Sequence, residues 1–245
     1  MSREQQLAEA FVGLADTLAD DFDPIVLLDS LAQHCVDLLG VDAAGVMVAK
    51  ANGELRTMAV SDGRAAMLEL FQLQIGEGPC VDAYGTGLAV VAADLTPAAE
   101  RWPRFAPVAM DAGFHAVYGL PLRVNHHVIG ALNLLSVTPD SLSSAGQDLA
   151  QALADVATVG LVHWRSDPTG PGEILTQVQA ALAAKASVDI ARGMLAEAGG
   201  LDPAQASRLL TVYSKQHGRR LTETAQALVG RTIDPATVLG ALPQA

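Results

Sequence analysis

The sequence predicts an α+β domain with a mostly antiparallel sheet, followed by an all-α unit. Along the first two thirds of the chain, apolar periodicity changes in the order helices, hairpin, helix, loop, hairpin, helix, which is typical of a sheet with helices packed on it. The last third shows only helical periodicity. Between them lies Ser166-Asp167-Pro168-Thr169-Gly170-Pro171-Gly172, which can continue neither a helix nor a central strand. We therefore expect a first domain over 1–165, a linker over 166–172 and a second domain over 173–245.

The first domain is expected to begin with two helices. Apolar residues at Leu7, Phe11 and Leu14 predict an amphipathic helix over 4–20. Asp23-Pro24 supplies an N-cap and a first-turn proline for a second helix, which Gly40 ends. The remaining elements expected in this domain are a strand at 43–49, a turn at Asn52-Gly53, a strand at 55–60, a helix at 64–73, a short helix at 80–84, a strand at 88–91, a short helix reaching about Asp111, strands at 117–124 and 128–135, and a helix at 143–165.

The second domain is expected to be a three-helix unit with a long first helix. Apolar residues spaced by three and four predict a helix over 173–198, which Gly199-Gly200 ends. Asp202-Pro203 caps a second helix that reaches about 217, and a third helix covers 221–229. A short amphipathic tail over 234–242 begins with another cap-and-proline pair.

The charge of the chain is unevenly divided. The whole sequence of 245 residues has a formal net charge of −12, which taken alone argues against a nucleic-acid partner. Residues 1–172 hold 8 Lys or Arg and 21 Asp or Glu, a net of −13, whereas residues 173–245 hold 7 and 6, a net of +1. The acidity therefore belongs to the first part, and the two parts are expected to have different partners.

Several function classes are excluded by the composition. The apolar runs are much shorter than the roughly 20 residues that a membrane span needs, and the polar N-terminus does not resemble a signal peptide. Two cysteines are too few for a disulfide framework or a structural zinc site. No catalytic triad, phosphate loop or carboxylate pair stands out. We therefore expect a cytoplasmic protein that is not an enzyme, with no membrane partner, no metal and no cofactor that the sequence identifies.

Residues 20–165 resemble the GAF domains of actinobacterial regulators. The resemblance rests on Gly76-Glu77-Gly78-Pro79-Cys80-Val81-Asp82-Ala83, Asp94-Leu95, Arg101-Trp102-Pro103, Gly119-Leu120-Pro121-Leu122 and Gly130-Ala131-Leu132-Asn133-Leu134. It implies a sensor fold with a central antiparallel sheet, whose members bind varied small ligands or only dimerise. The fold alone does not identify a ligand.

Cys80, Asp94 and Trp102 are the candidate ligand-sensing residues of this domain. Cys80 follows a Gly-x-Gly-Pro turn near a predicted helix N-terminus, where a thiolate would be favoured, but we favour its interpretation as a small buried hydrophobe. Asp94 and Trp102 either line a sensor cavity or belong to a loop held by packing of the tryptophan ring.

The three-helix unit resembles the ANTAR output domain. The matching residues are Val178-Gln179, Ala181-Leu182, Val188-Asp189, Ala191-Arg192-Gly193, Leu195, Ala206, Leu209, Leu210, Ser214, Arg219-Arg220-Leu221 and Ala225. The chain departs from the family at Ile190, where a glutamine is usual, and at Arg192, where a lysine is usual. The resemblance implies a transcription antiterminator that binds paired RNA stem-loops as a homodimer.

Seven residues are the candidate RNA contacts on this reading. They are Lys185, Arg192, Gly193, Ser214, Lys215, Arg219 and Arg220. Splayed loop bases and phosphates can be recognised by a small cationic patch. Four of these residues also have an ordinary interpretation: Arg192 as a partner of Asp189 three positions earlier, Gly193 as a point of tight helix packing, and Arg219-Arg220 as solvated charges.

Two other functions remain open from the sequence. A DNA-binding regulator would use the helix over 202–217, whose polar residues include Gln205, Ser207, Arg208, Thr211 and Lys215. The GAF resemblance also allows a thiol-dependent reductase, in which Cys80 is the cysteine in a plausible site region, whereas Cys35 lies in a predicted helix well before it. A hypothesis within the RNA-binding function is that the acidic first part competes with RNA for the basic face in an off state.

Overall fold

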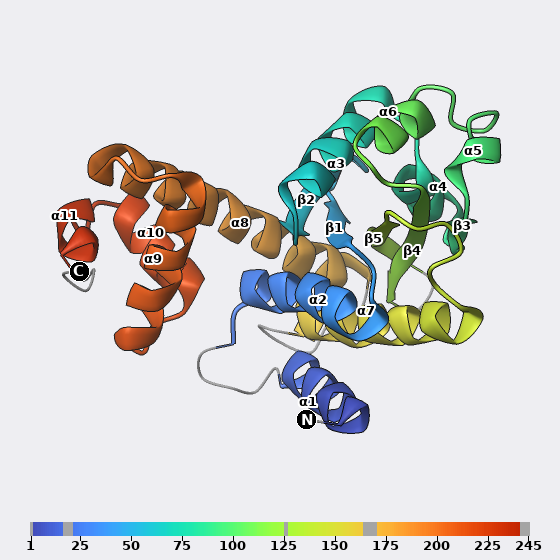
Figure 1. Cartoon of the computed structure of the whole chain (residues 1–245). Coiled ribbons are helices and arrows are strands. Elements are labelled where there is room, and N and C mark those ends of the chain that lie inside the picture. The colour runs from blue at the N-terminus through green and yellow to red at the C-terminus, as the bar shows by residue number, and fades with distance from the viewer. Residues whose placement is uncertain (1, 17–21, 125–126, 164–170, 241–245) are drawn as a thin grey trace.

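The computed structural model describes residues 2–16, 22–124, 127–163 and 171–240, and it is shown in Figure 1. The chain forms an α+β part that ends with α7 and a helical part that begins with α8. The helices and strands of the α+β part are α1 (Arg3–Ala15), α2 (Pro24–Leu39), β1 (Ala43–Ala49), β2 (Leu55–Val60), α3 (Gly63–Ile75), α4 (Pro79–Thr86), β3 (Val90–Ala92), α5 (Leu95–Ala98), α6 (Phe105–Asp111), β4 (Ala116–Val124), β5 (His127–Ser136) and α7 (Ser144–His163).

The five strands form one antiparallel sheet in the order β2-β1-β5-β4-β3. Two hairpins, β1–β2 and β4–β5, are joined where β5 pairs with β1. Successive side chains of a strand point to opposite faces of the sheet. In β1, Val46 and Val48 therefore reach one core and Ala43 and Met47 the other. Both faces of the sheet are covered, α3 to α6 lying on one side and α2 and α7 on the other (Figure 1).

The helical part consists of α8 (Pro171–Gly199), α9 (Pro203–Gln216), α10 (Leu221–Val229) and α11 (Pro235–Leu239). The long helix α8 begins beside the sheet and carries the other three helices away from it (Figure 1). Its residues Ile174 and Val178 are buried in the same apolar core as Leu28 of α2 and Leu161 of α7. The two parts of the chain therefore share one core.

A second connection between the parts is the carboxylate of Asp23, which is 3% exposed. Its Oδ1 accepts from the backbone N–H of Ile25 at 2.9 Å and so caps α2. Its Oδ2 accepts from the backbone N–H of Thr222 at 2.7 Å, in the first turn of α10. The residue at the N-cap position of α10 is Arg220, whose side chain contains no acceptor. Asp23 therefore caps one helix in each part.

The structure confirms the predicted fold class and the order of elements. The predicted caps Asp23, Gly40 and Asp202 are observed, and the strands at 43–49 and 55–60 have the predicted bounds. The strand expected at 88–91 is instead β3, at 90–92. Of the predicted linker, residues 166–170 lie outside the described residues, and Pro171 and Gly172 are helical because proline is well tolerated in the first turn of a helix.

Both cysteines are free and buried, on opposite faces of the sheet: Cys35 packs in the core with α2 and Cys80 in the core with α3 and α4. Within the described ranges, no three His, Cys, Asp or Glu side chains are grouped so that they could hold a metal ion. The same ranges contain no helix with the length and apolarity that crossing a membrane requires.

Glu69 of α3 places its carboxyl group inside the core, and the residue has no exposed surface. Its Oε1 occupies the space next to Gly45 of β1 where any other residue would place a Cβ. Among the described residues, neither carboxyl oxygen has a hydrogen-bond partner. Burial raises the pKa of Glu69 from 4.5 to about 8, and the nearby Thr57 hydroxyl offsets only part of this shift.

The raised pKa of Glu69 predicts a pH-dependent stability. Between about pH 4.5 and pH 8 the unfolded chain releases the proton of Glu69 while the folded chain keeps it, so the free energy of unfolding falls as pH rises through this window. As pH rises from one end of the window to the other, the free energy of unfolding of Glu69→Gln should increase relative to that of wild type by on the order of 4 kcal/mol. Urea unfolding at several pH values measures this difference. The exposed Glu100→Gln serves as the control, and equal pH profiles for wild type and Glu69→Gln would contradict the assignment.

Candidate nucleic-acid interface and sensor site

The turn between α9 and α10 presents two exposed cations, Lys215 and Arg219. Gly218 has a φ of +59°, and the backbone N–H of Arg219 donates to Ser214 O at 2.9 Å, so the turn is tightly closed. A hollow of about 360 Å³ lies beside it. The residues that line the hollow are Thr211, Ser214, Lys215, Gly218, Arg219 and Leu221, with Asp23 and Val26 of α2. This turn is the most open cationic part of the predicted set.

Ser214 and Arg220 are more constrained than the sequence suggests. Ser214 is 2% exposed, and its hydroxyl donates to the carbonyl of Leu210 at 2.8 Å. The expectation that this hydroxyl is offered to RNA does not fit this conformation, because the residue lies on the inner face of α9. Arg220 is half-buried at the start of α10, with Nε 3.8 Å from a carboxylate oxygen of Glu223.

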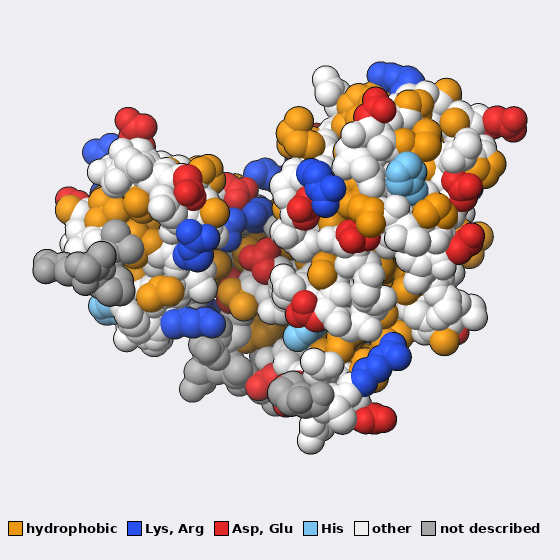
Figure 2. All heavy atoms as spheres, in the orientation of Figure 1, with side chains coloured by type: hydrophobic (Ala, Val, Ile, Leu, Met, Phe, Trp, Pro, Cys, Tyr) orange, Lys and Arg blue, Asp and Glu red, His pale blue; other side chains and the backbone are white. Residues whose placement is uncertain are grey.

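Lys185 and Arg192, both on α8, are held by acidic side chains. Lys185 is 12% exposed and lies 3.0 Å from Asp189. Arg192 is 21% exposed and lies 3.8 Å from Asp189 and 3.9 Å from Asp29 of α2. Asp189 also lies 3.8 Å from Arg56 of β2. Figure 2 shows cationic and acidic side chains gathered where the helical part meets the α+β part.

Gly193 is exposed, and a Cβ at this position would meet nothing within 4 Å. The interpretation of Gly193 as a point of tight packing therefore finds no support in this conformation, and the backbone there is open to approach. The glycine costs α8 about 1 kcal/mol relative to alanine.

The predicted cations do not form a single open patch. Lys215 and Arg219 are exposed, whereas Lys185 and Arg192 are paired with carboxylates. Both groups nevertheless lie along α2, because Val26 contacts the hollow at the turn and Asp29 contacts Arg192. Helix α2 of the first part thus lies beside both groups of candidate cations.

Sequence reasoning missed Asp29 and the second role of Asp23. The pKa of Asp29 is raised by burial, which outweighs the lowering by Lys185 and Arg192. Nothing local marks these residues, because their partners lie more than 150 positions away along the chain. The pairing of Asp189 with Arg192 had a local signal, since the two are three positions apart on one helix.

The three candidate sensing residues do not converge on one site. Cys80 is fully buried, and its pKa is raised by burial and then by the nearby Glu69 carboxyl. This burial agrees with the interpretation of Cys80 as a small buried hydrophobe and not with a thiolate, because removal from water outweighs any stabilisation of the charge by the helix N-terminus. Asp94 and Trp102 instead share a separate hollow of about 440 Å³ with Arg101.

Asp94 and Trp102 have structural partners. Asp94 accepts from the backbone N–H of Thr96 at 2.8 Å and caps α5, which lowers its pKa. Trp102 is 2% exposed, and its indole N–H donates to Asp82 at 3.0 Å. Its ring packs edge-on against Phe105. These contacts match the interpretation of a loop held by packing of the tryptophan.

Polar side chains on α9 are partly engaged in their own helix. Gln205 forms the capping box with Asp202, and the Thr211 hydroxyl donates to Ser207 O at 3.0 Å. Two of the residues that a DNA-reading helix would use are therefore occupied, which leaves Arg208 and Lys215 as exposed cations.

Two family models match the chain. The GAF domain matches residues 23–161, and the ANTAR domain matches residues 176–229. The first match covers the sheet, the helices from α2 to α6 and most of α7, and the second covers most of α8 together with α9 and α10. No curated protein matches the sequence.

Solved structures share the fold of the first part. The GAF domain of a phosphoenolpyruvate-protein phosphotransferase from Coxiella burnetii has a TM-score of 0.52 at 16% identity, over 67% of this chain and 97% of that one. The corresponding Acinetobacter domain has a TM-score of 0.50 at 14% identity, over 75% and 97%. Reduced fRMsr of Staphylococcus aureus has a TM-score of 0.50 at 17% identity, over 65% and 95%. At these identities the likeness concerns the fold alone.

The match to the GAF family extends over more than half of the chain, and the fold agrees with it. The ANTAR match implies an RNA-binding antitermination regulator, and the GAF match implies a sensor. The chain therefore belongs to the GAF domain family and carries an ANTAR domain in its C-terminal helices.

Proposed function

We propose that this protein is a cytoplasmic regulator that binds RNA stem-loops and acts by transcription antitermination. The observation that carries the proposal is the exposed turn with Lys215 and Arg219, which lies within the ANTAR match beside a hollow that Asp23 and Val26 also line. Their side chains would contact phosphates, and the open backbone at Gly193 gives RNA a place of close approach. Two copies of the chain, held as a homodimer, would bind two stem-loops.

The GAF part has a sensing role in this proposal. It shares a core with α8, so a change in its packing reaches the ANTAR helices directly. The pairing of Arg192 with Asp29, and of Thr222 with Asp23, supports an arrangement in which α2 competes with RNA for the basic face. The described conformation would then be the weakly binding one, and a ligand or a change of dimer packing would shift the population.

Replacing the exposed cations tests the RNA interface. Lys215→Ala and Arg219→Ala should each weaken binding about equally for all RNA sequences and reduce the slope of log K against log salt by about 1, because each removes one phosphate contact. Fluorescence anisotropy with a labelled RNA that carries two stem-loops measures both quantities. Arg231→Gln is the matched control, since this exposed arginine follows the ANTAR match. Unchanged affinity in both variants, or tighter binding to duplex DNA, would contradict the proposal.

Replacing Asp29 tests the competition by α2. Asp29→Asn removes the charge that faces Arg192, so RNA affinity should rise about threefold, as expected for the loss of one partly exposed ion pair. Asp37→Asn removes the same charge from an exposed position on the same helix and is the control. Weaker RNA binding by Asp29→Asn would show that α2 supports the interface instead of competing for it. Removing residues 1–170 is a less direct test, because it would expose the apolar residues of α8.

A further inference from the structure

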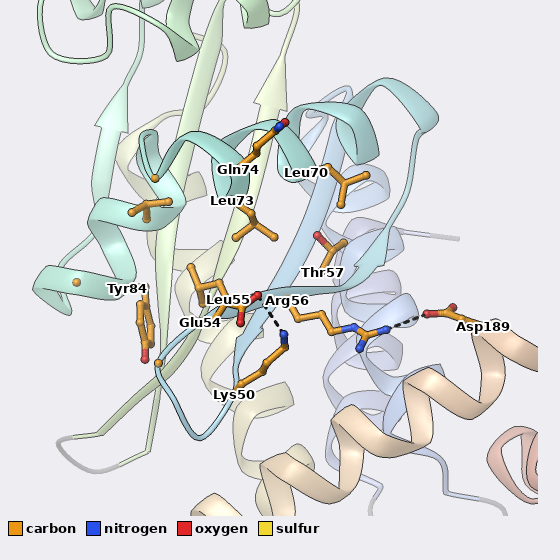
Figure 3. Close-up of a pocket in the computed structure, with 14 residues that line it drawn as sticks. Lys50, Glu54, Leu55, Arg56, Thr57, Leu70, Leu73, Gln74, Tyr84 and Asp189 are labelled. Carbon is orange, nitrogen blue, oxygen red and sulfur yellow. Dashed lines mark ion pairs between the residues drawn. The ribbon is translucent and has the colours of Figure 1, made fainter.

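A groove of about 820 Å³ lies at the edge of the sheet, between β2, α3 and α4 (Figure 3). It lies apart from the hollow that contains Asp94 and Trp102. Its size falls within the usual range of small-molecule sites, roughly 300–1,000 Å³. One of its residues, Asp189, comes from α8, so the groove is bordered by both parts of the chain.

The interior surface of the groove is mainly apolar. Leu55 comes from β2, Leu70 and Leu73 from α3, and Val81 and the Tyr84 ring from α4. Leu70 is 58% exposed, so its side chain is available to a ligand in the groove. Gly76 and Gly85 also line the groove, and a Cβ at either position would meet nothing within 4 Å. The groove therefore has room for an apolar body beside these glycines.

Two cations lie at the mouth of the groove, and each is held by one exposed acid. Lys50 lies 3.1 Å from Glu54, four positions away on the same hairpin. Arg56 lies 3.8 Å from Asp189 on α8, and both side chains are about 40% exposed. Figure 3 shows Arg56 reaching from β2 across to α8. Exposed ion pairs of this length contribute little, so another anion can replace the acid.

Arg56 is the better anion receptor of the two cations. Its guanidinium donates two parallel hydrogen bonds to a carboxylate, sulfonate or phosphate, which an ammonium group does not match. Its partner Asp189 is shared with Lys185 and Arg192, so the pair is not exclusive. Lys50, in contrast, has a closer partner on its own hairpin.

We propose that this groove binds a small amphipathic anion, with an apolar body on Leu70, Leu73 and Tyr84 and an acidic head on Arg56. The head displaces Asp189, which is the ion-pair partner of Arg56 on α8. The inference rests on the sensor role proposed above, and it adds the chemical class of the ligand and the contact that the ligand breaks. Asp189 then remains paired only with the cations of α8 itself.

The test uses the full-length protein and two fluorescent probes of nearly the same shape. 8-Anilinonaphthalene-1-sulfonate carries an acidic head, and N-phenyl-1-naphthylamine is its neutral counterpart. Wild type should bind the sulfonate saturably at one site. Arg56→Gln should weaken sulfonate binding about tenfold, the factor expected for one charge-assisted contact, and leave the neutral probe unchanged. Leu70→Gln changes an exposed position and should not affect folding, and it should weaken the binding of both probes.

A second variant predicts a change of opposite sign. Asp189→Asn removes the competing acid, so sulfonate affinity should rise about threefold. Arg101→Gln replaces an arginine at the other hollow and is the matched control, so the affinity for each probe should stay the same. Absence of saturable binding, equal losses for the two probes in Arg56→Gln, or weaker sulfonate binding in Asp189→Asn would each overturn the proposal. RNA binding is measured separately, so a failure of the groove is distinguished from a failure of the RNA-binding function.

Discussion

The packing of α8 against the α+β part is the constraint on which the arrangement of the molecule depends. Ile174 and Val178 bury one side of the helix in the core formed by α2, α7 and the sheet. Because this part of α8 is apolar on its inner side, its position is set by area removed from water and not by a few polar contacts. The rest of α8 then carries α9, α10 and α11 outward, so their placement relative to α2 follows from the same packing (Figure 1).

Ion pairs add a second, weaker set of contacts between the two parts of the chain. Asp189 lies within ion-pair distance of Arg56, Lys185 and Arg192, which come from both parts of the chain. One carboxylate cannot satisfy three cations fully, so the balance among them responds to any new anion nearby. These ion pairs could not be inferred from the net charge of −12, because that value averages an acidic domain and a nearly neutral one.

The fold was accessible from the sequence because its signals are local. Asp23-Pro24, Gly40 and Asp202-Pro203 mark helix ends by backbone chemistry that needs no tertiary partner, and the strands of the β1–β2 hairpin have the predicted bounds. The candidate sites were less accessible. Ser214 is buried because its face of α9 turns inward, and its hydroxyl then donates to the carbonyl of Leu210. Which face turns inward depends on tertiary packing. Burial of Cys80 reverses the thiolate that a helix N-terminus would favour.

The carboxylate of Asp23 has a consequence for how the two parts can separate. While the parts are docked, it satisfies a backbone N–H at the start of α2 and another at the start of α10. A missing N-cap costs a helix about 1 kcal/mol, and α10 has no acceptor of its own at that position. Undocking would therefore loosen the first turn of α10 at the same moment that it separates Arg192 from Asp29. Any signal that separates the two parts must supply the free energy of this lost cap. Helix α10 would then meet an RNA partner with its first turn partly unfolded.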